Sequence, residues 1–254
     1  MNRFGGNTSC VVISREGEAP IVCDSGTGLR FYGLDSSEDA FHGTMLISHL
    51  HWDHVQGLPF FPQILHADST PKIYGPPEDS MSFADALSGI VRPPYFPVDL
   101  DGLPGDLQIH DIDNESILVG SATVTARPVP HAGNTNGYRI EWPDFSLAYI
   151  PDHQEPDDGT TIADGVRELV DGVDLLIHDA QFTQDLLAKR QDWGHCTPRY
   201  AVHVAETCGA SELAMFHHDP LHSDDVVDGL VAQAQAQSST CKVIGAAEGL
   251  KLSF

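Results

Sequence analysis

The chain contains a series of short apolar segments, each of which stops at a turn-forming or polar residue. Two of them are residues 146–150 before Pro151 and residues 175–177 before His178. Apolar runs of this length between turn residues are typical of buried β-strands. The other segments of this kind cover residues 10–13, 21–23, 45–47 and 117–119. The sequence therefore predicts a fold built on short buried strands.

Segments with apolar residues at helical spacing follow, mostly in the second half of the chain. They cover residues 81–91, 160–171, 183–190, 197–208 and 223–237. The last segment begins with Ser223, Asp224 and Asp225, which are good capping residues. The chain has no internal repeat and no linker long enough to separate two domains. We therefore predict an α/β fold in which helices cover sheets, with residues 1–254 forming a single domain.

Composition places the chain among ordinary globular proteins. The chain has 254 residues, of which 41% are hydrophobic and 20% are charged, and this excludes disordered and fibrous classes. No apolar run approaches the roughly 20 residues of a membrane helix, and the first residues do not resemble a signal peptide. We expect a cytoplasmic protein that does not bind membranes.

The charge balance is strongly acidic. Thirteen Lys and Arg residues face 37 Asp and Glu residues, which gives a formal net charge of −24. Such a surface repels a phosphate polymer, so we expect no nucleic-acid polymer as a partner. The excess of carboxylates has two interpretations, an adaptation of the surface to salt or solubility and the binding of cations. The five cysteines form no CxxC pair, which favours reduced thiols over a disulfide framework.

One segment concentrates potential metal ligands. His49, His51, Asp53 and His54 follow directly after the apolar run at 45–47. In an extended chain, residues two apart point the same way, so His49 and His51 project together. Asp53 and His54 come where the chain could turn into a helix. Imidazole nitrogens suit Zn²⁺ and similar ions, and a carboxylate can complete a second ion beside the first.

This HxHxDH segment resembles the signature of the metallo-β-lactamase superfamily. The resemblance implies a four-layer αββα sandwich of two mixed β-sheets flanked by helices. It also implies three further ligands at the ends of later strands, for which the chain offers His131, Asp152 and His217 in the right order. By this resemblance, His49, His51 and His131 hold one metal, Asp53, His54 and His217 hold the other, and Asp152 bridges them. His153 and His218, each beside one of these residues, are the alternatives.

Further segments are similar to the ribonuclease Z and phosphoribosyl cyclic phosphodiesterase branch. Asp174–Ala180 (DLLIHDA) resembles the HEAT motif of that branch with Asp in place of Glu, and residues 193–197 (WGHCT) resemble its HST motif with Cys in place of Ser. The resemblance makes His195 a group that faces the scissile phosphate without binding metal, and Asp179 its orienting partner. Together with Asp53, they are the candidate catalytic residues. Asp24 is a candidate partner that fixes the tautomer of a ligand histidine.

The turn Gly26-Thr27-Gly28 leaves two interpretations, a cradle for phosphate and a tight turn between a strand and a helix. The short distance in sequence between His131 and Asp152 leaves no room for the inserted arm by which ribonuclease Z grips transfer RNA.

We therefore predict a dinuclear hydrolase that cleaves small phosphodiesters, of cyclic nucleotide or cyclic phosphate type, with a hydroxide that bridges two divalent ions. Zn²⁺ is the expected metal, with Mn²⁺ or Fe as alternatives, and a homodimer is a further possibility. The alternative function is hydrolysis of a carboxyl-type bond in a lactone, thioester or β-lactam. A metal-binding module without catalysis is a third hypothesis, and a redox role has little support because the chain has no room for a flavodoxin-like domain.

Overall fold

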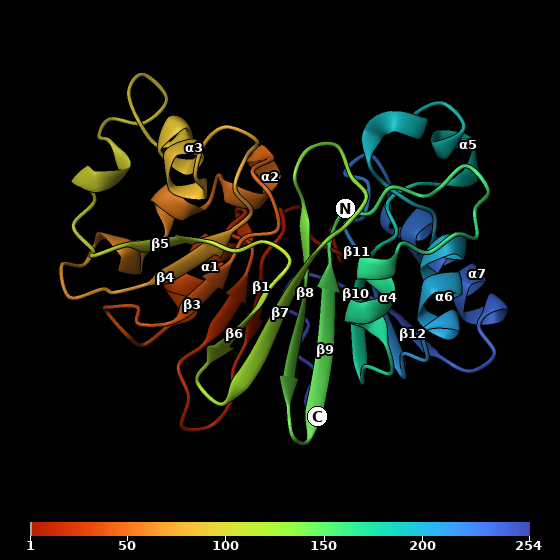
Figure 1. Ribbon diagram of the computed structural model, residues 1–254. Coiled ribbons are helices and arrows are strands. Elements are labelled where there is room, and N and C mark those ends of the chain that lie inside the picture. The colour runs from red at the N-terminus through yellow and green to blue at the C-terminus, as the bar shows by residue number, and fades with distance from the viewer. Residues whose placement is uncertain (1) are drawn as a thin grey trace. The chain divides into compact units, whose positions relative to one another are not determined.

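The computed structural model describes residues 2–254 and divides into two compact units (Figure 1). The N-terminal unit comprises residues 7–113 and 119–121. The C-terminal unit comprises residues 2–6, 114–118 and 122–254. The expectation of one domain over residues 1–254 stays a prediction.

The N-terminal unit is built on a five-stranded sheet in the order β1-β2-β3-β4-β5. Strand β1 is antiparallel to β2, and the remaining neighbours are parallel. The strands are β1 (Val11–Ile13), β2 (Ile21–Cys23), β3 (Thr44–Leu46), β4 (Lys72–Gly75) and β5 (Gln108–Asp111). The helices are α1 (Gly28–Asp35), α2 (Trp52–Val55) and α3 (Phe83–Ile90), with 3-10 turns at Leu58–Phe60, Pro62–Leu65 and Leu100–Gly102. Because β2 and β3 are parallel, the segments that follow them, which begin with Asp24 and Ile47, leave the sheet at the same edge.

The core of this unit lies on one face of the sheet. Val22, Met45 and Ile73 come from three neighbouring strands, and they belong to one buried cluster with Leu29 of α1 and Leu87 of α3. Alternation along each strand places these side chains on the same face. The helices thus bury the apolar face of the sheet and leave its edge to carry polar side chains.

The C-terminal unit is built on a seven-stranded sheet in the order β12-β11-β10-β9-β8-β7-β6. Strands β9 to β12 are parallel, whereas β8 is antiparallel to both β7 and β9. The strands are β6 (Ser116–Val119), β7 (Ala122–Pro128), β8 (Asn136–Trp142), β9 (Phe145–Ile150), β10 (Leu175–Asp179), β11 (Glu212–Phe216) and β12 (Lys242–Gly245). The helices are α4 (Asp164–Val170), α5 (Gln184–Leu187), α6 (Pro198–Thr207) and α7 (Asp224–Gln237), with a 3-10 turn η4 at Gln191–Trp193.

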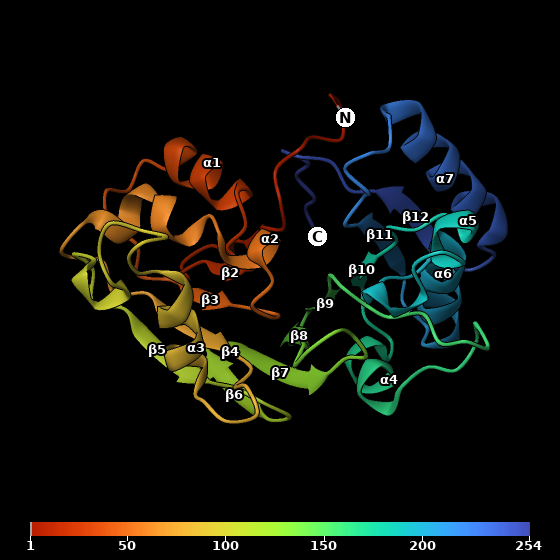
Figure 2. The ribbon, with the colours of Figure 1, turned by 90° about the horizontal axis from the view of Figure 1, so that it is seen from above.

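Figure 2 shows α4, α6 and α7 together on one side of β9 to β12. Ala148, Leu176 and Leu213 point to that side and belong to one buried cluster with Val166 of α4 and Tyr200 of α6. The alternate residues of the strands, which include Leu147, Tyr149 and Ile177, are also buried. Both faces of these strands are therefore apolar, which explains why they read as continuous apolar runs in the sequence.

The sequence predictions of secondary structure are confirmed for the six apolar runs, which correspond to β1, β2, β3, β6, β9 and β10. The predicted helices at 81–91, 197–208 and 223–237 are confirmed as α3, α6 and α7. The mixed α/β class is confirmed as well, since each unit is a mixed sheet flanked by helices. Within residues 2–254, no helix combines the length and the apolar character needed to cross a membrane.

Two predicted helices are too long. Helix α4 begins at Asp164 rather than near residue 160, because the Asp158 carboxylate accepts hydrogen bonds from the backbone N–H groups of Thr160 and Thr161 at 2.9 and 2.8 Å. Such side-chain bonds compete with helix formation. Helix α5 ends at Leu187, and the chain continues through a short irregular segment to η4.

We expect Leu176→Ala to lower the free energy of unfolding by about 2–5 kcal/mol, because it leaves a cavity in the buried cluster beneath α4 and α6. Urea denaturation followed by circular dichroism measures the change. Leu118→Ala is the matched control, since Leu118 is 80% exposed and its truncation changes stability by no more than about 0.5 kcal/mol. Equal losses for the two variants would contradict the assignment of the core.

Candidate metal centre

In the C-terminal unit, strand direction gathers the candidate residues at one edge of the sheet. Strands β9, β10 and β11 are parallel, and β7 runs the same way because β8 is antiparallel to both β7 and β9. His131, Asp152 and His217 follow the ends of β7, β9 and β11, and Asp179 is the last residue of β10. Residues far apart in the sequence thus meet at the carboxyl edge of one sheet.

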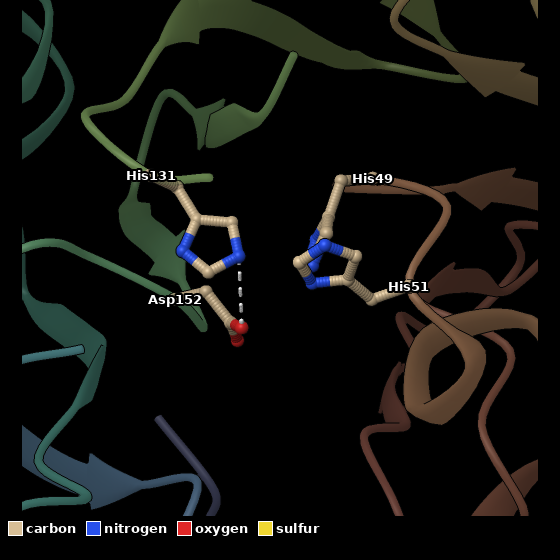
Figure 3. A group of neighbouring side chains, drawn as sticks. All are labelled: His49, His51, His131 and Asp152. Atoms are coloured by element: carbon tan, nitrogen blue, oxygen red, sulfur yellow. Dashed lines mark ion pairs between the residues drawn. The ribbon is translucent and has the colours of Figure 1, made fainter. Parts of the chain in front are cut away.

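Asp152 lies between two histidines of this unit. Its Oδ2 atom is 3.5 Å from Nε2 of His131, and its Oδ1 atom is 3.4 Å from Nε2 of His217. Figure 3 shows His131 and Asp152 pointing toward one another. With metal–ligand bonds of about 2.0–2.2 Å, two ligands of one ion lie roughly 3–3.5 Å apart. Each oxygen of Asp152 is therefore at the right separation to share an ion with a different histidine.

Hydrogen bonds orient both histidines. Nδ1 of His131 donates to the backbone oxygen of Gly194 at 2.7 Å, which leaves Nε2 to face Asp152. Nδ1 of His217 lies 2.7 Å from the side-chain amide of Gln181. Fixing one ring nitrogen determines which nitrogen a metal can use. The neighbouring histidines do not share this arrangement. Nε2 of His218 donates to the backbone oxygen of Ala246 at 2.9 Å. Nδ1 of the buried His153 lies 2.9 Å from Nε2 of His178.

His195 is paired with a buried carboxylate. Its Nδ1 donates to Oδ2 of Asp179 at 3.0 Å and lies 3.9 Å from Oδ2 of Asp152. Burial by itself lowers the pKa of His195, but the charge and hydrogen bond of Asp179 and the charge of Asp152 outweigh it. The pKa of His195 is therefore raised above its ordinary value, and the imidazolium form is favoured.

Asp179 also holds the backbone around this pair. Its carboxylate accepts hydrogen bonds from the N–H groups of His153 at 3.1 Å, Gln181 at 2.9 Å and Cys196 at 3.3 Å. The side chain is fully buried, so these donors replace the water that a carboxylate otherwise needs. One side chain thus positions the segments that carry Asp152 and His195.

Gly194 is a functional position that the sequence reasoning missed. Its φ of +88° favours glycine, and a Cβ atom there would lie 2.1 Å from Nδ1 of His131. Its N–H donates to Oε1 of Gln154 at 2.8 Å, so Gln154 holds the backbone that orients His131. Gln154 and Gln181 were missed as well. Each lies two positions after a recognised aspartate, but their partners are remote in sequence, so spacing gave no signal.

The N-terminal unit has its own cluster around Asp24. Oδ2 of Asp24 accepts hydrogen bonds from Nδ1 of His54 at 2.6 Å and from Oγ of Ser48 at 2.9 Å. Oγ of Ser48 in turn lies 3.0 Å from Nδ1 of His49. These bonds engage Nδ1 of both histidines, so Nε2 would be the nitrogen that binds a metal. Asp24 therefore contacts His54, a candidate ligand, as the sequence reasoning expected.

His51 and Asp53 complete this cluster. The rings of His49 and His51 lie 4.4 Å apart, and Figure 3 shows the two side chains beside one another. Oδ2 of Asp53 is 3.5 Å from Nε2 of His54, again a separation suited to a shared ion. Helix α2 begins at Trp52, which turns Asp53 and His54 away from the extended segment before it.

The turn at residues 26–28 joins β2 to α1 and does not resemble an anion cradle. The Gly26 N–H donates to Ser9 O at 2.8 Å, the Thr27 N–H to Thr8 Oγ1 at 2.9 Å and the Gly28 N–H to Thr8 O at 3.4 Å. Because these donors already have protein acceptors, the turn has a structural role.

Each unit thus brings together its own share of the predicted residues. The C-terminal unit gathers His131, Asp152, Asp179, His195 and His217, and the N-terminal unit gathers His49, His51, Asp53 and His54. Their roles as ligands and catalytic groups stay predictions.

We expect Asp24→Ala to weaken zinc binding about 10- to 100-fold, because the carboxylate orients His54 and raises its basicity. Competition with a chromogenic chelator measures the dissociation constant. Asp111→Ala is the control, since Asp111 is an aspartate of the same unit that accepts a hydrogen bond from Phe83 N rather than from a candidate ligand. Unchanged zinc affinity in a folded Asp24→Ala protein would contradict the role of Asp24.

In the metal-free protein, we expect Asp179→Asn to lower the pKa of His195, because burial then acts without the opposing charge. A raised pKa stabilises the fold below the unfolded value near 6.5, and this contribution is lost as pH rises through the folded pKa. Asp179→Asn should therefore remove stability mainly on the acidic side. NMR titration of the His195 ring measures the shift, with Asp174→Asn, just before the start of the same strand, as the control. A His195 pKa that is the same in both variants would contradict this account.

Several known proteins are similar to this chain in sequence or in fold. The curated relatives include ribonuclease Z from Halorubrum lacusprofundi, which is 24% identical over 267 residues that cover 85% of this chain and 82% of the relative. Among solved structures, the metallo-beta-lactamase fold protein YhfI from Bacillus subtilis matches with a TM-score of 0.75 and 20% identity, over 96% of this chain and 90% of that protein. A diphosphatase of the PhnP family matches with a TM-score of 0.71 and 20% identity, over 97% of this chain and 84% of that protein.

The predicted metallo-β-lactamase fold is confirmed by these structural matches. The sequence profile of the beta-lactamase superfamily domain matches residues 39–218, more than half of the chain. The chain therefore belongs to the beta-lactamase superfamily.

Proposed function

We propose that this protein is a metal-dependent hydrolase of the phosphodiesterase type that cleaves small phosphodiesters, such as cyclic nucleotides or cyclic phosphates. The observation that carries the proposal is the pair of His195 and Asp179 beside Asp152. Hydrolysis of a phosphodiester needs a proton for the leaving oxygen, and a histidine held by a buried carboxylate can supply it. Two of the similar proteins named above are a ribonuclease Z and a diphosphatase of the PhnP family, which supports hydrolysis at phosphorus.

The residues present fit two divalent ions. His49, His51 and His131 would hold one, Asp53, His54 and His217 the other, and Asp152 would bridge them. Imidazole and carboxylate donors suit Zn²⁺ first, with Mn²⁺ or Fe as alternatives. The support comes from each unit by itself, namely the Nδ1 hydrogen bonds of His49, His54 and His131 and the two oxygens of Asp152 that face different histidines. When bound, such ions activate water near neutral pH and polarise a phosphoryl oxygen.

The protein's own residues supply the remaining steps. Nδ1 of His195 is occupied by Asp179, so the acidic proton is the one on Nε2. The Asp179 carboxylate stabilises the imidazolium and keeps the ring in one orientation. As the bond from phosphorus to the leaving oxygen breaks, His195 gives its Nε2 proton to that oxygen. The side chain of His195 then becomes a neutral imidazole. Asp53 would serve as a metal ligand. Because its side chain is partly exposed, it would also lie near the attacking water.

A small substrate fits the charge of the chain better than a polymer. A net charge of −24 repels RNA at long range, whereas a compact diester carries a single charge. The ribonuclease Z relatives make RNA the natural comparison in any assay. The five free thiols favour a reducing compartment, so we place the activity in the cytoplasm. A homodimer is compatible with this proposal.

The second candidate is hydrolysis of a carboxyl-type bond, such as a lactone, thioester or β-lactam. The superfamily name favours it. Residues 193–197 (WGHCT), which contain His195, argue against it, because they resemble a motif of the phosphodiesterase branch.

We expect His195→Ala to reduce hydrolysis of a nucleoside 2′,3′-cyclic phosphate, whose leaving group is an alkoxide that needs a proton, about 10²- to 10⁴-fold while metal content stays unchanged, because the residue transfers a proton and does not bind metal. Mass spectrometry measures the metals, and a chromogenic β-lactam assayed on the same sample tests the alternative. His203→Ala is the control, since His203 contacts Thr160 and residues of its own helix. Undiminished phosphodiester turnover in His195→Ala, or turnover of the β-lactam alone, would overturn the proposal.

A further inference from the structure

Trp193 is an exposed aromatic residue two positions before His195. It ends the 3-10 turn η4 and is 59% exposed. The guanidinium of Arg190 lies over its ring, 4.5 Å from the centroid. Because the indole is more than half exposed while Arg190 covers one face, the opposite face is open to solvent.

Arg190 links this indole to the candidate acid. Its guanidinium also lies 5.9 Å from the ring of Phe182, and that ring packs edge-on against His195 at 5.2 Å. Nη1 of Arg190 lies 3.7 Å from Oδ2 of Asp219, which is buried. The guanidinium is therefore fixed between two rings and a carboxylate, and the series Trp193, Arg190, Phe182 runs from the surface to His195.

We propose that the open face of Trp193 is a stacking site for the nucleobase of a nucleoside phosphodiester. This inference rests on the proposed function and narrows its substrate to diesters that carry a base. An exposed tryptophan backed by a cation is a platform for any base, because every base presents a π-face. The guanidinium behind the ring holds the indole in place by a cation–π contact and offsets the negative field of the chain beside an anionic substrate.

The two rings beside Arg190 differ in burial. Phe182 is fully buried and packs the guanidinium against the body of the unit. Trp193 instead presents an aromatic surface to solvent two positions before a candidate catalytic residue. Base stacking on an aromatic side chain is expected to strengthen binding about tenfold to a hundredfold.

The test compares two cyclic diesters that share the same five-membered phosphate ring. Adenosine 2′,3′-cyclic monophosphate carries a base, and glycerol 1,2-cyclic phosphate does not. Calorimetric titration of the metal-free protein and quenching of tryptophan fluorescence measure binding without catalysis. We expect Trp193→Ala to weaken binding of the adenosine compound about tenfold to a hundredfold, to abolish the quenching and to leave the glycerol compound unaffected. Trp193→Phe should keep most of the affinity, and Phe254→Ala, an equally exposed aromatic of the same unit, should change nothing.

Several outcomes separate this proposal from the proposed function. Equal losses for both compounds, or no loss for either, would overturn the stacking site. Binding of a short oligoadenylate with the same dependence on Trp193, but not of the mononucleotide, would support the site and identify an RNA end as the source of the base. If the metal-loaded protein hydrolyses neither compound while Trp193-dependent binding persists, the phosphodiesterase proposal fails and the stacking site stands.

Discussion

The cluster of candidate residues in the C-terminal unit depends on the buried carboxylate of Asp179 and its hydrogen bonds. A charge with no access to water requires other partners, and Asp179 has them in three N–H groups of the backbone and in Nδ1 of His195. These donors come from the segments after β9, β10 and η4. Removing the carboxylate would release all of them at once, so the position of Asp152 and the proton on His195 are consequences of one buried charge.

Asp24 has the corresponding role in the N-terminal unit. It orients His54 by a direct hydrogen bond and His49 through Ser48. Both units also use unusual backbone at these positions. Asp24 and His217 have φ values of +60° and +55°, a conformation that costs a residue with a side chain about 1–3 kcal/mol. The fold therefore accepts local strain where it presents the polar groups of the site.

Much of the fold could be predicted from the sequence. The apolar runs at 146–150 and 175–177 were recognisable because buried strands lack polar residues on either face. The start of α4 was less accessible, since the carboxylate of Asp158 binds the backbone before the helix through hydrogen bonds that apolar periodicity does not register. The choice of His217 over His218 was predicted from its place after the strand, and the structure brings His217 to Asp152.

The sequence by itself determined which side chains are available for chemistry: histidines and aspartates after strand ends, a motif with His195, and a net charge of −24. It could do so because ligand types and strand periodicity are local properties of the chain. Only the tertiary structure decided which atoms meet. The contacts of Gly194 with His131, of Gln181 with His217 and of Arg190 with Trp193 and Phe182 depend on strand order and loop paths. Such contacts join segments remote in sequence, and no local pattern encodes them.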